Sequence, residues 1–213
     1  MNRDDISNCT QFDGGFMRIN KSIFLAILAL ALITTSCQLP IRNNSKETPI
    51  PSSDSPLSKD DYLEWRELWF NIKPEEIGLD NDPNSTIPFA IVMDIGLDDG
   101  ESASFASSIV GDGSFLTSTG GGILGSGQQY ESVRNASKQF VEMSADYVDK
   151  MELTTEYPLP SADNIKFYVI TPSGTYTTSE ADWDTLGSGN HELSPLFFAG
   201  NDVITAIREA SGQ

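Results

Sequence analysis

The chain has 213 residues, 38% of them hydrophobic and 21% charged, which suits one domain of ordinary size with appended segments. Thirteen basic residues stand against 31 acidic ones, giving a net charge of −18. Such a chain repels phosphate backbones and anionic lipid headgroups, so its charge disfavours nucleic acid as a partner.

The first 36 residues have the pattern of a targeting segment. Arg18 and Lys21 precede an apolar run over 23–33, a length that fits a signal-peptide core and is short of the roughly 20 residues of a membrane-spanning helix. Met17 opens a compact basic segment, whereas residues 1–16 carry three Asp residues that suit a signal poorly. We therefore expect 1–16 to be an extension ahead of the true start and 17–36 to be a signal peptide.

Thr34-Thr35-Ser36-Cys37 follows the apolar run and resembles the lipobox of bacterial lipoproteins. This resemblance implies cleavage before Cys37 and attachment of lipid to it. An ordinary secretory signal and an uncleaved anchor are the alternatives. Gln38 stands where inner-membrane lipoproteins carry Asp, so the resemblance implies the periplasmic face of the outer membrane if the cell is Gram-negative.

The segment after the cysteine is rich in Pro, Ser and Asn and has no hydrophobic period. Such a composition buries too little apolar area to offset its ordering entropy. We expect residues 37–57 to be a flexible tether and 58–213 to be a single folded domain. The remaining cysteine, Cys9, lies in the extension, so the domain has no thiol for a disulfide, a nucleophile or a metal site.

Hydrophobic spacing and capping residues predict the helices of the domain. Ser58 and Asp61 form a capping-box pattern ahead of a helix that ends at Pro74. A long amphipathic helix is expected from near Gln128 to Met151, and a short one between a Ser179 cap and Gly187. Ser194 and Pro195 signal the last helix. The buried stripe of the first helix is expected to be Tyr62, Trp65, Leu68, Trp69 and Ile72, with an aromatic binding surface as the alternative for its two tryptophans.

Five strands are expected, separated by Gly, Asp and Pro turns: 89–96, 102–110, 114–118, 165–171 and 175–178. The first three are joined by short turns, which predicts an antiparallel meander. The order of elements indicates an α+β fold: a five-stranded, mainly antiparallel sheet with three main helices packed on it.

Three stretches together resemble a family of small uncharacterised bacterial proteins: GDGSFLTSTGGGILGSG, Ser132-Val133 and LSPLFFAGNDVITAIRE. The resemblance covers most of residues 65–213 and implies no catalytic residue. The order of elements also loosely resembles roadblock- and profilin-like interaction folds.

The glycine-rich stretch 111–128 joins the third strand to the long helix and is the candidate ligand site. Its candidate residues are Asp112, Ser118, Thr119, Gly120, Gly121, Gly122 and Gly125. The spacing of the last three matches a dinucleotide fingerprint, which places backbone N–H groups around a pyrophosphate. The acidic residue that should end the next strand is missing, since Asp146 falls within the predicted helix. A structural turn is favoured over a small ligand or peptide, and either over a nucleotide.

Other candidate sites are weak. Asp80-x-Asp82-x-Asn84 lacks the Gly and Glu of a calcium loop, and we predict no metal and no cofactor. The only histidine, His191, is interpreted as a turn residue. Nothing in the spacing of Asp94, Asp98, Asp99 and Asp112, which lie on predicted strands or turns, favours a carboxylate pair. We expect an envelope protein-interaction module, with a small-molecule binder or enzyme using residues 111–127 as the alternative.

Overall fold

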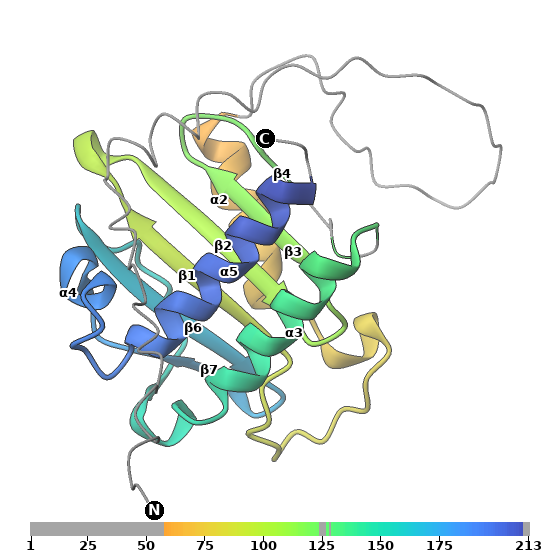
Figure 1. Cartoon of the computed structure of the whole chain (residues 1–213). Coiled ribbons are helices and arrows are strands. Elements are labelled where there is room, and N and C mark those ends of the chain that lie inside the picture. Colours follow the sequence, from red (N-terminus) through yellow and green to blue (C-terminus); the bar gives the residue numbers. More distant parts are fainter. Residues whose placement is uncertain (1–57, 124–126, 128, 211–213) are drawn as a thin grey trace, which may run out of the picture. The chain divides into compact units, whose positions relative to one another are not determined.

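The computed structural model describes residues 58–123, 127 and 129–210. The predicted extension, signal peptide and tether, with Cys37, lie outside these described residues. The described part is an α+β unit with an antiparallel sheet and three main helices (Figure 1), which confirms the predicted class. None of its helices has both the length and the hydropathy of a membrane span.

The sheet contains the five predicted strands and three shorter ones. Seven strands follow one path in the order β4-β3-β2-β1-β6-β7-β5, and β8 pairs with β6 outside it; all pairs are antiparallel. Their bounds are β1 Ala90–Gly96, β2 Ser102–Ser108, β3 Gly113–Thr117, β4 Gly122–Ile123, β5 Glu152–Thr154, β6 Asn164–Thr171, β7 Gly174–Thr177 and β8 Ala181–Asp182.

The predicted number of five strands is therefore too low. The three additional strands, β4, β5 and β8, have only two or three residues each. A period of two cannot show in so few residues, and these segments become strands only because a neighbouring edge is available for pairing.

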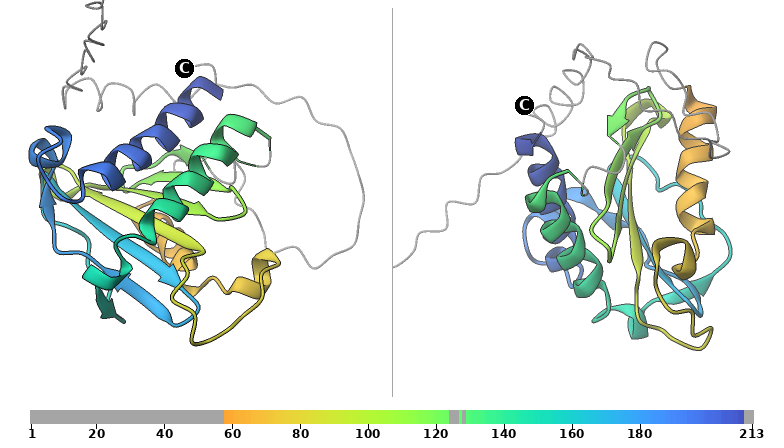
Figure 2. Two further views of the ribbon diagram at one scale, coloured as in Figure 1. Left: turned by 60° about the horizontal axis from the view of Figure 1, so that its bottom comes forward. Right: turned by 90° about the vertical axis from the view of Figure 1, so that its right-hand side faces the viewer.

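The three main helices lie on both faces of the sheet. They are α2 (Lys59–Asn71), α3 (Glu131–Ser144) and α5 (Ser194–Ala210), with the short α4 at Trp183–Gly187. Figure 2 shows α3 and α5 side by side on one face and α2 on the other. Strand alternation supplies both faces: Met93 of β1 lies close to Gly200 of α5, whereas its neighbour Asp94 points to α2.

Two helix boundaries differ from the prediction. Helix α3 ends at Ser144 rather than near Met151, and a separate 3₁₀ turn follows at Val148–Lys150. The Ser144 hydroxyl donates to the carbonyl of Val141, a local bond that competes with helix continuation. Helix α4 is capped by Asp182 rather than Ser179, because the Asp182 carboxylate accepts from the N–H of Thr185 at 2.8 Å.

The first helix keeps its predicted start but turns a different face inward. Ser58 and Asp61 form the capping box, as expected. The side chains that α2 buries are Tyr62, Arg66 and Phe70, so the predicted stripe is right at Tyr62 but misses Arg66 and Phe70. Trp69 and Ile72, which also belong to that stripe, are partly buried and pack against the hydrophobic core. Leu68, a member of that stripe, is 52% exposed. Polar partners on the sheet determine which face of α2 turns inward, and the hydrophobic pattern of the sequence does not reveal them.

Candidate functional site

A buried chain of polar groups joins α2 to the sheet. Two nitrogens of Arg66, Nε and Nη2, donate to Oδ2 of Asp94 at 2.9 and 2.5 Å. The Ser104 hydroxyl donates to the other carboxylate oxygen at 2.5 Å. The Tyr62 hydroxyl lies 2.8 Å from Ser104 Oγ. Because a serine hydroxyl has one proton and Ser104 gives it to Asp94, Tyr62 is the donor of this last bond.

These groups are almost completely shielded from water. Asp94 is 0% exposed and Arg66 7%. The Arg66 guanidinium also lies over the Phe70 ring, 4.8 Å from its centroid. A buried ion pair of this kind contributes little net stability while intact, because desolvation offsets the attraction, but losing one partner leaves an uncompensated charge. The pair therefore holds α2 in one register.

Burial and neighbouring charges shift the pKa values of these buried polar groups. Burial raises the pKa of the Asp94 carboxyl above its ordinary value, and Arg66 and Ser104 oppose the rise. For Arg66, burial lowers the pKa, but the charge and hydrogen bond of Asp94, together with Tyr62 and Tyr168, raise it overall. Burial and then the charge of Asp94 raise the pKa of the Tyr62 phenol. Arg66 thus stays charged and Tyr62 stays protonated across the physiological range, and both carboxylate oxygens of Asp94 already accept hydrogen bonds within the network.

The side of α2 that faces solvent carries two parallel ridges. One is apolar, at spacing i, i+3, and the other is acidic, at spacing i, i+4, i+7; both spacings keep residues on one side of a helix. The apolar ridge is Trp65 and Leu68, and the acidic ridge is Asp60, Glu64 and Glu67. Trp65 is half-buried, whereas Leu68 and all three acidic side chains are exposed.

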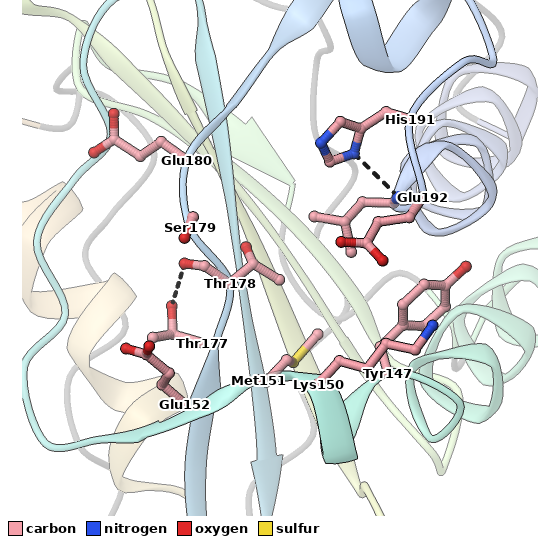
Figure 3. A pocket seen from close by; sticks show the side chains of 11 residues that line it. Tyr147, Lys150, Met151, Glu152, Thr177, Thr178, Ser179, Glu180, His191 and Glu192 are labelled. Atoms are coloured by element: carbon pink, nitrogen blue, oxygen red, sulfur yellow. Dashed lines mark hydrogen bonds between the residues drawn. The ribbon is translucent and has the colours of Figure 1, made fainter.

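A pocket of about 180 Å³ opens at the edge of the sheet formed by β7 and β5. Figure 3 shows its walls: the end of β7 and the irregular segment 178–180 after it on one side, and the turn before α5 on the other. The lining is mostly polar and comprises Tyr147, Lys150, Met151, Glu152, Thr177, Thr178, Ser179, Glu180, His191, Glu192 and Leu193.

His191 projects into this pocket from the turn before α5 (Figure 3). Its Nδ1 accepts a hydrogen bond from the N–H of Leu193 at 3.1 Å, which fixes the orientation of the ring. Glu192 follows it directly and also helps to raise the pKa of Tyr147, after burial and Asp146. The arrangement offers donors and acceptors to a small polar ligand. The interpretation of His191 as a turn residue agrees with its bond to Leu193.

The residues predicted to bind a ligand lie at the opposite edge of the sheet. Gly120 and Gly121 have φ of 96° and 104° and form the hairpin turn from β3 to β4, where only glycine adopts the backbone freely. Gly122 belongs to β4 and pairs with Leu116. Gly125 lies outside the described residues.

The other three predicted residues take part in this local structure. The Ser118 hydroxyl accepts from the N–H of Ser102 at 2.8 Å. Thr119 is exposed, and its hydroxyl lies 3.3 Å from that of Thr117. The N–H of Asp112 donates to the Ser108 hydroxyl at 3.2 Å, which closes the turn after β2.

Gly111 and Gly127 of the glycine stretch lie against each other beside α3. An added Cβ on Gly127 would lie 1.6 Å from the carbonyl oxygen of Gly111, so the two backbones touch. Arg134 of α3 donates from Nη1 to the Gly127 carbonyl at 2.9 Å. These contacts give Gly127 a structural role.

The calcium-like stretch 80–84 forms a local turn rather than a metal site. In the described ranges, no group of three or more His, Cys, Asp or Glu residues is placed to hold an ion. At the calcium-like stretch, the Asp82 carboxylate accepts from the N–H of Asn84 at 3.0 Å and forms a local turn.

Sequence reasoning missed the polar chain beneath α2. The sequence prediction treats Asp94 only as one of four aspartates on strands or turns and does not name Arg66 or Ser104. One signal was present: Tyr62, Arg66 and Phe70 are spaced by four residues, which places a lone arginine between two aromatic residues on one helix face.

No protein-family model, curated protein or solved structure gives a match to the chain.

Breaking the buried ion pair should unfold the domain more easily. Asp94→Ala or Arg66→Met should each lower the free energy of unfolding by about 3–5 kcal/mol, because each leaves a buried charge unpaired. The double variant should lose clearly less than the sum of the two. Urea unfolding followed by tryptophan fluorescence measures all three, with the exposed Glu67→Gln as a control that should change by less than about 0.5 kcal/mol. Additive losses would contradict the coupling.

The close approach of Gly127 and Gly111 gives a second stability prediction. Gly127→Ala should destabilise by about 1–3 kcal/mol, because the methyl group meets a backbone carbonyl that cannot move aside cheaply. The matched control is Gly187→Ala at the end of α4, where the added Cβ would meet only Phe197 at 3.8 Å. Thermal unfolding should show a loss for the first variant alone; equal melting temperatures would rule out the contact.

Proposed function

We propose that the chain is a membrane-anchored lipoprotein of the bacterial cell envelope, whose folded part, 58–213, is a protein-interaction module. The lipobox-like sequence ending at Cys37 and the polar segment after it support the anchor and the tether. Gln38 favours the periplasmic face of the outer membrane in a Gram-negative cell. The domain itself is too acidic to be drawn to anionic lipid, so attachment depends on the acyl chains.

One structural observation carries the interaction role. The chain enters the folded part through α2, directly after the proposed tether, and α2 presents apolar side chains to solvent. Leu68 is 52% exposed and Leu63 38%. Apolar and aromatic side chains in contact with solvent, bordered by charges, are typical of the surfaces that proteins use to bind one another.

Lipid attachment is tested at Cys37. In full-length protein expressed in a Gram-negative host, the mature protein should fractionate with membranes and carry the added mass of at least two acyl chains. Cys37→Ser should leave an unlipidated precursor, because the modified atom is the cysteine sulfur. Intact-mass measurement decides between the two, and a mature wild-type mass without acyl groups would overturn the anchor.

A small-molecule binder is the second candidate, and the pocket beside His191 is the observation that favours it. A thermal-shift screen against metabolites, nucleotides and cations tests it. A ligand at a hundred times its dissociation constant should stabilise the protein by about 2.7 kcal/mol. Binding in the pocket should be lost in Ser179→Trp, which fills it, and kept in Ser132→Trp on the exposed start of α3.

The same screen distinguishes binding at the predicted site, the glycine-rich stretch 111–127, from binding in the pocket beside His191. Thr119→Trp would obstruct that loop and leave the pocket open, so loss of a thermal shift in this variant alone would assign the ligand to the loop. A screen in which no compound stabilises the folded wild-type protein would count against both sites.

A further inference from the structure

The two ridges of α2 identify the kind of partner that this helix fits. We infer that α2 docks a basic amphipathic segment of another envelope protein, with the partner's apolar side chains on the apolar ridge and its Lys or Arg side chains on the acidic ridge. This inference rests on the proposed interaction role and names the surface and the chemistry of the partner.

The charge of the outer side of α2 follows from the buried ion pair. The helix contains two cations, Lys59 and Arg66. Arg66 is turned inward and committed to Asp94, so Lys59 at the first helical position is the only cation left to face water. Asp60, Glu64 and Glu67 are exposed, and no Lys or Arg of this helix lies three or four residues from any of them, the spacing at which an opposite charge would balance them.

The acidic ridge costs the helix stability. Asp60 and Glu64 are four residues apart and Glu64 and Glu67 three, and like charges at these spacings destabilise a helix by about 0.2–0.5 kcal/mol per pair. A basic partner would remove this repulsion on binding. Leu68 lies three residues from Trp65 and has half of its surface exposed beside the acidic ridge, so one partner segment can contact both ridges at once.

The net charge of the domain also disfavours a second copy or an anionic membrane as the occupant of this surface. Residues 58–210 contain eight Lys and Arg against 26 Asp and Glu, so the described region holds the whole net charge of −18. A second copy would bring an identical acidic ridge against the first, and an anionic membrane surface would repel it too. A basic segment gains from the same field, which also speeds its encounter with α2.

Site-specific photo-crosslinking in cells of the source organism tests the inference with the full, anchored chain. A photoreactive residue at Leu68 should form an adduct with another protein. The same residue at Glu142, exposed on α3 across the sheet, should not. Mass spectrometry should place the adduct in a partner segment that has apolar residues flanked by Lys or Arg.

Charge reversal gives the specific prediction. Glu64→Lys with Glu67→Lys should abolish the adduct at Leu68, and reversing the basic residues of the identified partner segment should restore it. The matched control is Glu131→Lys with Glu142→Lys on α3, which makes the same change in net charge and should leave the adduct in place. Unchanged melting temperatures confirm that the variants are folded, since the altered side chains are exposed.

The outcomes separate this inference from the function on which it rests. Adducts at Leu68 with a second copy, with lipid or with an acidic segment would overturn it. So would adducts found only with photoreactive residues at Leu153 on β5 or Val110 after β2, although the interaction role would then stand. No protein adduct at any of these positions would overturn both.

Discussion

The contact between Arg66 and Asp94 is the interaction on which the arrangement of α2 depends. A charge buried beneath a helix must be matched, because water no longer stabilises it. Asp94 is matched from two sides, by the guanidinium of α2 and by the hydroxyl of Ser104 on β2. Any other rotation of the helix would leave that carboxylate without its cation, so the pair selects one register among several that hydrophobic contacts alone would permit.

This constraint has consequences on the outside of the helix. Turning Arg66 inward brings Tyr62 and Phe70 inward with it, since residues four apart share a helix face. Trp65 and Leu68 are then left toward solvent beside an acidic ridge. The Arg66–Asp94 pair that fixes the buried side of α2 therefore also determines its solvent-facing side, to which we assign partner binding.

The two candidate sites occupy opposite edges of the sheet and are different in kind. At the β3 and β4 edge, glycines make turns and close backbone contacts, as at Gly121 and Gly127. At the β7 and β5 edge, side chains surround an open volume, with His191 held in place by a backbone N–H. Glycine-rich sequence marks where the backbone must bend, and a pocket forms only where distant segments leave space between them.

The sequence by itself determined the local features: the capping box at Ser58 and Asp61, the strong strands β1 and β6, and the antiparallel meander, because each depends on residues close together in the chain. Only the tertiary structure decided the buried face of α2, the strands β4, β5 and β8, and the pocket. Asp94 looks like one more acidic residue until β2 and α2 are placed beside it, and the bonds it makes with residues 10 and 28 positions away override the hydrophobic period of the helix.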